Sequence, residues 1–222
     1  MLRAVHRCKL IPEDFLFFVS YEFNTFTQMQ PVIHNYALTY ALAQQFNVAS
    51  LGTKPHYEEL QGFGRYATPA VALDDPQFVT HTYNSVCTRT NQTQSSFNVP
   101  SLGRNRKLVP ASTRFEFFVF SDGSRIPRYV RIGKKSCISR IEAHELKIVE
   151  RVEDPSEAVS VEACFNLLDL SPNDVVTTAD MLLMYPSPVA KSMTVRAPHV
   201  VLEDGTREIV LPIPKHLRMV EG

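Results

Sequence analysis

The sequence predicts one α+β domain built on an antiparallel β-sheet, and three features of its 222 residues favour this fold class. Short segments in which apolar and polar residues alternate recur along the chain, as they do in half-buried strands. Residues 34–46 have the apolar face and the Ala and Leu content of a helix. Residues 84–112 are rich in Thr, Asn, Gln and Ser without an apolar period, which predicts a long insertion.

The first half of the chain is expected to supply strands on both sides of the helix. Residues 3–10 alternate and predict the first strand, and the apolar residues 15–21 predict a second strand or an extension of the first. Pro31 precedes the helix, whose start carries Asn35 as a candidate cap. Residues 78–83 predict a further strand that leads into the insertion.

Hairpins are expected in the second half of the chain. The segments 115–120 and 126–132 flank the turn signal Asp122–Gly123, which predicts that they pair with each other. The turn signal Asp204–Gly205 predicts a second hairpin near the C-terminus. Residues 138–152, which lie between the two hairpins, predict at least one strand, with a helix from Ala143 as the alternative.

Residues 1–222 are expected to form a single domain in which 84–112 is a thumb-like insertion. A ferredoxin-like core of the RNA-recognition type fits the order of strands and helix, although the pattern alone does not require it. The chain is long enough to bury a core without disulfide or metal support.

The motifs of common enzyme classes are absent from the sequence. It contains no G-x-x-x-x-G-K-[ST], no G-x-G-x-x-G, no G-x-S-x-G and no H-E-x-x-H. None of its seven histidines lies at metal-ligand spacing from another His or a Cys. We therefore expect no catalytic residue, no metal and no cofactor.

The chain is also expected to be cytoplasmic and to have no membrane partner. No run approaches the roughly 20 apolar residues that a membrane span needs. The first residues lack the apolar stretch of a signal peptide, and the four cysteines are scattered, as in proteins of a reducing compartment.

The formal net charge is zero, but the charges are segregated along the chain. Ten basic and two acidic residues lie between Arg104 and Arg140, whereas the residues from Glu142 onward comprise fourteen acidic and seven basic ones. A positive block in a neutral protein indicates that a polyanion binds at one surface. Solvated strand faces are the alternative explanation.

Three groups of residues within or near this pattern are candidate RNA contacts. Arg104, Arg106 and Lys107 place three cations on the insertion, where a flexible basic loop can neutralise phosphates. The run Arg128 to Lys135 contains Arg128, Tyr129, Arg131, Lys134 and Lys135, and Arg140 follows it. On a strand Tyr129, Arg131 and Gly133 share one face, which combines a stacking platform with a cation, and Gly133 would let a nucleic-acid backbone come close. His34, Asn35 and Tyr36 open the helix, where free N–H groups favour an anion.

Several blocks of the sequence, which extend to about residue 170, match segments of a known family in the same order. They include Leu16-Phe17-Phe18, the run HNYALTYAL from His34 to Leu42, Tyr66 to Ala70, Pro127 to Lys135, and Asn166 to Leu170. These blocks resemble the Csc-one family, which is the Cas-five-type subunit of type I-D CRISPR complexes.

The resemblance implies a ferredoxin-like core of the RAMP type with a long hairpin or thumb. It implies a subunit of the Cascade complex that caps the 5′ handle of the guide RNA (crRNA) and contacts the first backbone subunit and the large subunit. These contacts would lie near the place where the flanking motif of the target (PAM) is read, so that target DNA is a further expected contact. The cations of the insertion and of the run 128–135 would then face the RNA.

Two alternatives from other classes stay open. A metal-independent endoribonuclease that processes precursor crRNA would need a base and a cation near the scissile phosphate, for instance His34 or His81 with Tyr36 or Lys134. A structural adaptor would use the basic block to bind an acidic protein partner.

Overall fold

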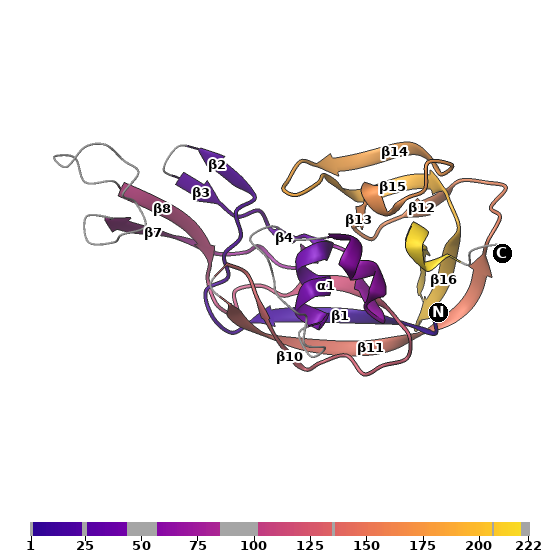
Figure 1. The fold of residues 1–222 in the computed structure, drawn as a ribbon, viewed down its shortest axis with the longest axis horizontal. Coiled ribbons are helices and arrows are strands. Elements are labelled where there is room, and N and C mark those ends of the chain that lie inside the picture. The colour runs from indigo at the N-terminus through magenta and orange to yellow at the C-terminus, as the bar shows by residue number, and fades with distance from the viewer. Residues whose placement is uncertain are drawn as a thin grey trace.

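The computed structural model describes residues 2–23, 26–43, 57–84, 102–134, 136–205 and 207–218. Within these residues the strands form one nine-stranded sheet and two four-stranded sheets, and nearly all strand pairs are antiparallel (Figure 1). The described part contains a single α-helix, α1 (Asn35–Ala43). The predicted antiparallel sheet is confirmed, while the helical content is lower than an α+β domain normally has. No helix of this part is long and apolar enough to cross a membrane.

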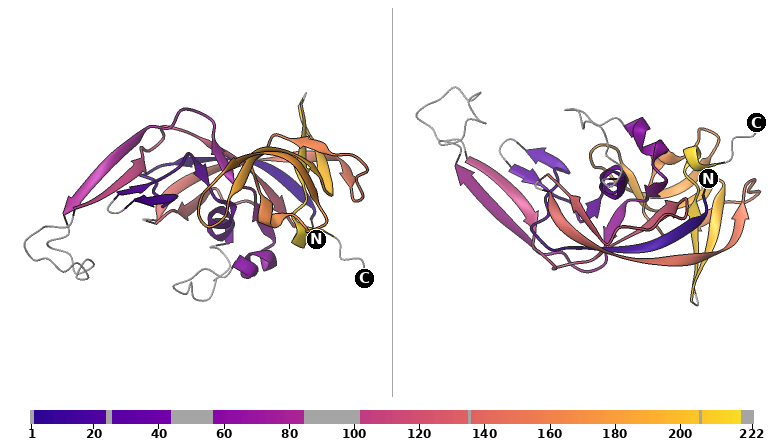
Figure 2. Two further views of the ribbon diagram at one scale, coloured as in Figure 1. Left: turned by 90° about the horizontal axis from the view of Figure 1, so that it is seen from above. Right: turned by 60° about the horizontal axis from the view of Figure 1, so that its bottom comes forward.

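The large sheet is strongly curved and wraps around one side of α1 (Figures 1 and 2). In the order in which they neighbour one another, its strands are β17 (Arg207–Pro212), β16 (His199–Asp204), β11 (Cys137–Val152), β1 (Ala4–Pro12), β9 (Phe115–Ser121), β6 (Ala70–Ala72) and β4 (Val32–Ile33). Two further strands join its margins: β10 (Tyr129–Ile132) pairs with β11, and β5 (Arg65–Ala67) pairs with β9.

The core lies where β1 and β9 meet α1. Cys8 and Leu10 of β1 lie opposite Phe117 and Phe115 of β9, and all four side chains are buried. Leu38 of α1 belongs to the same apolar cluster. The side-chain period of β1 therefore decides that Cys8 and Leu10 face the helix, because a shift by one residue would turn Arg7 and Lys9 inward.

The second sheet lies beside the first and is formed by the C-terminal half of the chain. Its strands are β12 (Val159–Val161), β13 (Phe165–Asn166), β14 (Val175–Leu182) and β15 (Val189–Arg196). The short helix η4 (Leu167–Asp169) follows β13 directly, and η5 (Lys215–Leu217) lies near the C-terminus. An apolar cluster that contains Val32 of β4 and Val189 of β15 joins the two sheets.

The third sheet projects from the body of the molecule (Figure 1). Its strands are β2 (Tyr21–Phe23), β3 (Phe26–Gln28), β7 (Phe78–Asn84) and β8 (Leu102–Leu108). We call the antiparallel pair β7 and β8 the arm. Residues 102–108 were expected to be part of a structureless loop, and this expectation is wrong because they pair with β7 along its whole length. Residues 85–101 of the predicted insertion lie outside the described residues.

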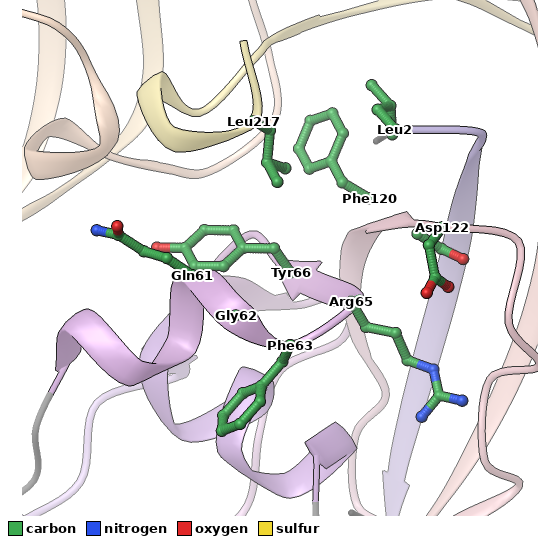
Figure 3. Close-up of a pocket in the computed structure, with 11 residues that line it drawn as sticks. Leu2, Gln61, Gly62, Phe63, Arg65, Tyr66, Phe120, Asp122 and Leu217 are labelled. Carbon is green, nitrogen blue, oxygen red and sulfur yellow. The ribbon is translucent and has the colours of Figure 1, made fainter. Parts of the chain in front are cut away.

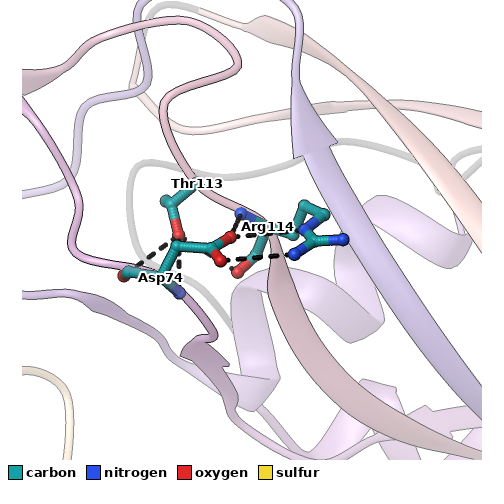
Figure 4. A network of polar contacts seen from close by, with 3 residues as sticks. All are labelled: Asp74, Thr113 and Arg114. Carbon is teal, nitrogen blue, oxygen red and sulfur yellow. Dashed lines mark hydrogen bonds and ion pairs between the residues drawn. The ribbon is translucent and has the colours of Figure 1, made fainter.

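A small polar cluster joins the segment that precedes β7 to the segment that follows β8, at the base of the arm (Figure 4). Asp74 lies shortly before β7, and its carboxylate accepts hydrogen bonds from the Arg114 guanidinium, from Nε at 3.3 Å and from Nη2 at 3.2 Å. The Thr113 hydroxyl lies 3.3 Å from the carbonyl oxygen of Asp74 and donates to it. Because the Asp74–Arg114 pair is solvent-exposed, it fixes geometry more than it adds stability.

Residues 16–17 connect the arm to β10. Leu16 exchanges two backbone hydrogen bonds with Leu108 at the base of β8, at 3.2 and 2.9 Å. The carbonyl oxygen of Phe17 accepts from the backbone N–H of Lys134, at 3.0 Å, in the turn between β10 and β11. The strand predicted for residues 15–21 is therefore wrong, since Leu16 makes only an isolated bridge to Leu108 and the next strand, β2, begins at Tyr21.

The predicted hairpin of residues 115–120 and 126–132 is also wrong. Both edges of β9 are occupied, one by β1 and the other by β5 and β6, so β10 pairs with β11 instead. The C-terminal hairpin is confirmed as β16 and β17. Residues 138–152 lie within the sixteen-residue strand β11, so the alternative helix from Ala143 is wrong.

We predict that Gly133→Ala lowers the free energy of unfolding by about 1–3 kcal/mol. Gly133 has a φ of +83°, and a Cβ atom there would lie 2.9 Å from Leu16 Cδ1 and 3.0 Å from the carbonyl oxygen of Phe17. Gly62→Ala is the matched control, because no atom lies within 4 Å of its added Cβ. Denaturant unfolding measures both variants, and equal stability of the two would contradict this account of Gly133.

Candidate nucleic-acid interface

Strand β10 exposes one face and buries the other, as its sequence predicts. Tyr129 and Arg131 are exposed, whereas Val130 and Ile132 are buried in the core under α1. Tyr129 is 53% exposed, which is unusual for so large an aromatic side chain. The Arg128 guanidinium carbon lies 5.8 Å from the centroid of the Tyr129 ring. A guanidinium beside an open aromatic face is an arrangement that holds a phosphate and stacks a base.

The turn after β10 carries Lys134, whose side chain is exposed. Its backbone is fixed by the hydrogen bond to Phe17 described above, so the cation has a rigid base. Gly133 was expected to let a nucleic-acid backbone come close, but the backbone that approaches it is that of Phe17 in the same chain. Lys135, the last cation of this run, lies outside the described residues.

The arm presents its cations from a regular strand, not from a loop. Arg104 and Arg106 lie opposite Thr82 and Thr80, so that the two cations and the two hydroxyls share one face. Lys107 lies on the other face. The Arg106 guanidinium carbon lies 4.2 Å above the centroid of the Phe78 ring, at the base of the arm.

No acidic residue occurs between Asp75 and Glu116 in the sequence, a segment that includes both strands of the arm. Among the described residues the cations of β8 therefore have no carboxylate on their own hairpin. In water such a strip attracts phosphates from a distance of about one Debye length, roughly 8–10 Å.

Arg140 is in a different position from the other predicted contacts. Its guanidinium donates to Glu13 Oε1 at 3.1 Å and also to Glu142, which raises the pKa of Arg140. On the same face of the large sheet Arg7 is likewise placed between Glu116 and Asp204. Each of these two cations is neutralised by two carboxylates, so we leave Arg140 out of the candidate surface.

His34 and Asn35 lie in the interior, with 5% and 0% of their surfaces exposed. Asn35 is the first residue of α1, and the cap is His34, whose Nδ1 accepts from the backbone N–H of Tyr36 at 3.3 Å. The prediction that Asn35 is the cap is therefore wrong. An RNA contact by His34 or Asn35 would require their internal hydrogen bonds to open. Tyr36 is half-buried against the His34 ring.

These side chains belong to an interior polar network, which consists of His34, Asn35, Tyr66, Asn166, Asp169 and Ser187. Its hydrogen bonds run in one direction toward a carboxylate. Ser187 donates to Asn166 Oδ1 at 3.2 Å, and Asn166 Nδ2 donates to Asn35 Oδ1 at 3.1 Å. Asn35 Nδ2 donates to Asp169 Oδ2 at 3.0 Å and to the Tyr66 hydroxyl at 3.1 Å. Tyr66 donates to Asp169 Oδ1 at 2.7 Å.

The direction of these hydrogen bonds fixes the tautomer of His34. Because the Ser187 hydroxyl proton points to Asn166, Ser187 Oγ must accept at its 2.9 Å contact with His34 Nε2. His34 then carries its proton on Nε2 and accepts at Nδ1, which is the neutral form. Burial lowers the pKa of His34 to about 4, in agreement with this geometry. His34 in this state is a poor general base near neutral pH.

Asp169 is the one carboxylate in the network and is 5% exposed. Burial raises its pKa to about 7, although the hydrogen bonds from Tyr66 and Asn35 and the charge of Lys215 act in the opposite direction. Burial of the hydroxyl and the nearby carboxylate also raise the pKa of Tyr66 far above its ordinary range. Sequence reasoning missed the network because Asn35 and Asp169 are 134 positions apart.

A cavity of about 170 Å³ lies between β5, β9 and η5 (Figure 3). Phe63, Tyr66, Phe120 and Leu217 supply its apolar walls. The Arg65 guanidinium points away from these rings, donating to Ser124 Oγ at 3.0 Å and to the carbonyl oxygen of Leu42 at the end of α1, at 3.2 Å. None of the predicted RNA contacts lines this cavity, and the described residues contain no cluster of three His, Cys, Asp or Glu side chains that could hold a metal.

One protein family matches nearly the whole chain. The family described as type I-D CRISPR-associated protein Cas5/Csc1 matches residues 3–220. A chain of the Type III-B Cmr-beta complex, solved by cryo-EM with cognate target RNA and AMPPnP (state 1), is 13% identical with a TM-score of 0.49, covering 88% of this chain and 85% of that chain. In Cmr-beta bound to cognate target RNA, a chain is 12% identical with a TM-score of 0.49, covering 86% of both chains. A search of curated proteins found no match.

We predict that His34→Gln changes how stability depends on pH. The unfolded chain takes up a proton at His34 near pH 6.5, while the folded chain resists this until about pH 4. The unfolded state thus binds more protons between these values, and stability contributed by neutral His34 is lost as the pH falls through this window. Gln can donate to Ser187 but cannot titrate. As the pH falls through this window, the free energy of unfolding of the variant should therefore rise relative to that of the wild type, by up to about 1.4 kcal/mol per pH unit.

The measurement is the free energy of unfolding of both proteins at several pH values between 7.5 and 4. The raised pKa of Asp169 acts with the opposite sign in this window, but it is present in both proteins and leaves their difference unchanged to first order. Parallel pH profiles for the two proteins would contradict a buried neutral His34.

Proposed function

The chain belongs to the type I-D CRISPR-associated Cas5/Csc1 family, and from this premise we propose that it is a guide-RNA-binding subunit of a type I-D CRISPR complex. In this proposal it cuts no RNA itself. Its contribution is to hold the RNA by phosphate neutralisation and base stacking, and to join the RNA to other subunits.

The observation that carries the proposal is the acid-free arm. Its cations project on a strand away from a body in which Arg7 and Arg140 are each neutralised by two carboxylates. A protein partner with scattered charges needs no such separation, whereas a polyanion follows a continuous positive strip. The electrostatic difference between arm and body therefore favours RNA over the acidic protein partner of the adaptor alternative.

The exposed face of β10 is the second part of the proposed RNA surface. It contributes Arg128, Tyr129, Arg131 and Lys134. Residues 16–17 tie the base of the arm to the β10–β11 turn, so the two parts are held by the same short segment. We propose that phosphates lie along the arm and that an unstacked base lies on Tyr129, which is the mode in which single strands are commonly bound.

The finer assignments rest on the family. We propose that the RNA segment is the 5′ handle of the crRNA, that the arm acts as the thumb, and that the chain contacts the backbone and large subunits near the PAM-reading end, where target DNA is a further contact. The order β11–β1–β9–β6, with α1 between β1 and β6 along the chain, supports a split β-α-β core of the ferredoxin-like type.

We predict that two triple variants bind repeat RNA more weakly than the wild type. One replaces Arg104, Arg106 and Lys107 by Gln, and the other replaces Arg128, Arg131 and Lys134 by Gln. For three lost phosphate contacts the slope of log K against log salt should become shallower by about 2. Replacing Lys147, Lys191 and Arg207 by Gln is the control, because it removes the same charge from strands of the C-terminal half. Fluorescence anisotropy at several salt concentrations measures all of them. Two triple variants that bind like the control would contradict the assigned surface.

We predict that purified protein leaves repeat RNA intact in the absence of metal. His34 is neutral and buried, and the His81 ring packs edge-on against Phe15 at 5.1 Å between centroids. A denaturing gel of labelled repeat RNA tests this. A specific cut that is lost in His81→Ala or His34→Gln would overturn the proposal and establish the ribonuclease alternative.

A further inference from the structure

Strand β3 lies beside the arm and places an aromatic residue next to its cations. In the parallel pairing of β3 with β8, Phe26 lies opposite Arg104, and Thr27 lies opposite Asn105. The Thr27 hydroxyl donates to Asn105 Oδ1, and Asn105 is only 6% exposed, so these two side chains share one face of the sheet, which we call the covered face. Because side chains alternate between the two faces of a sheet, Phe26 and Arg104 share the opposite face.

This opposite face begins in the core and becomes polar toward the end of the arm. At its base Leu108 pairs with Phe78, and both belong to or pack against the largest apolar cluster. Farther out, Phe26 is half-buried and belongs to none of the apolar clusters of the described residues. We call this outer part the β3–β8 face, and it consists of Phe26, Gln28, Thr80, Thr82, Arg104 and Arg106.

The charges of the third sheet are divided between its two faces. Its four strands contain three Lys or Arg residues and one carboxylate, and the register places that carboxylate, Glu22, opposite Thr27 on the covered face. Lys107 also belongs to the covered face. The acidic residues just before β7 are Asp74, which belongs to the polar cluster described above, and Asp75. Within the described strands the β3–β8 face therefore has two arginines and no carboxylate.

A ring beside a guanidinium, with hydroxyl and amide groups nearby, matches the chemistry of one nucleotide. Phe26 offers an apolar plane to a base, and Arg104 on the neighbouring strand offers a cation to a phosphate. Thr82, which lies opposite Arg104, and Gln28 of β3 are groups that can hydrogen-bond to a 2′-hydroxyl or to a base edge. A base inside a duplex already stacks on its neighbours, so only an unpaired base can use the ring.

We propose that the β3–β8 face binds an unpaired base of single-stranded RNA, which stacks on Phe26 while Arg104 holds an adjacent phosphate. This inference rests on the proposed function, in which RNA follows the arm. It adds the residue on which a base stacks there and a preference for single strands over duplexes. RNA is favoured over a protein occupant because both arginines of the face belong to the acid-free strip of the arm.

The variant Phe26→Leu tests the ring, because leucine keeps an apolar side chain and removes the aromatic plane. We expect it to bind single-stranded repeat RNA at least about 5-fold more weakly than the wild type, which corresponds to the loss of one stacked base. The slope of log K against log salt should stay unchanged because no phosphate contact is lost. Affinity for the same RNA annealed to its complement should also be unchanged.

Two variants serve as controls for Phe26→Leu. Phe26→Tyr keeps an aromatic plane and should bind single strands like the wild type. Phe15→Leu removes a ring from the other side of the sheet, since Phe15 packs against His81, which lies opposite Asn105 on the covered face. It should also bind like the wild type.

Tryptophan fluorescence reports stacking directly. The sequence contains no tryptophan, so Phe26→Trp places a single reporter on the β3–β8 face, and Phe15→Trp places one on the covered face. Single-stranded RNA should quench the emission of Phe26→Trp strongly and that of Phe15→Trp little. This measurement stays informative even if Phe26→Leu is poorly folded.

Absence of quenching in Phe26→Trp, or wild-type affinity of Phe26→Leu for single strands, would overturn the inference. If the variant of Arg104, Arg106 and Lys107 still binds weakly in that case, the proposed function stands and only the stacking role of Phe26 is lost. If both triple variants also bind like the wild type, the RNA surface itself is wrong. A Phe26→Leu variant that binds RNA normally but no longer assembles with the other subunits would assign the face to a protein partner instead.

Discussion

The burial of one carboxylate organises the joint between the two halves of this protein. A buried charge is tolerated only when donors surround it, and Asp169 obtains them from Tyr66 of β5 and Asn35 at the start of α1. Asn35 is in turn oriented by Asn166, and Asn166 by Ser187. The large sheet, the helix and the second sheet therefore share a single set of hydrogen bonds. Removing any member leaves a buried polar atom unpaired, which costs more than the bond itself contributes.

The body and the arm differ in how their charged side chains are paired. In the body, Arg7 and Arg140 are each held between two carboxylates, and Asp174 is held by Arg218. In the arm, the described cations face solvent or an aromatic ring. The polar cluster of Asp74, Thr113 and Arg114 joins the two segments at the base of the arm, so the body sets the direction of the arm. The surface of the arm keeps its positive charge. The cations that carboxylates neutralise in the body and the cations of the arm thus lie in separate parts of one chain.

The parts of the fold that the sequence predicts are those decided by local pattern. The alternation of Tyr129 and Arg131 with Val130 and Ile132, the strand at residues 3–10 and the C-terminal hairpin follow from side-chain period and turn residues alone. The failures have long-range causes. β10 pairs with β11 because both edges of β9 are already occupied, and residues 102–108 become a strand because β7 offers them an edge. Asn35 and Asp169 each resemble ordinary surface residues until a fold brings them together. The blocks at residues 34–42 and 166–170, which carry the family resemblance, include four members of the interior polar network: His34, Asn35, Asn166 and Asp169.

The length of chain that separates the members of the interior polar network has a consequence for biosynthesis. While the ribosome adds residues one at a time, Asn35 is made early, but its partners Asn166 and Asp169 follow more than 130 residues later, and Ser187 later still. Until then Asn35 lacks its partners from the second sheet, and β1 lacks its neighbours β9 and β11 until those strands have been made. A nascent chain that stops short of residue 187 therefore cannot complete its interior, and its apolar strands stay open to wrong pairing. The joint between the two halves of the protein is therefore expected to form late, after the residues of the largest core cluster, 8–141, have been made.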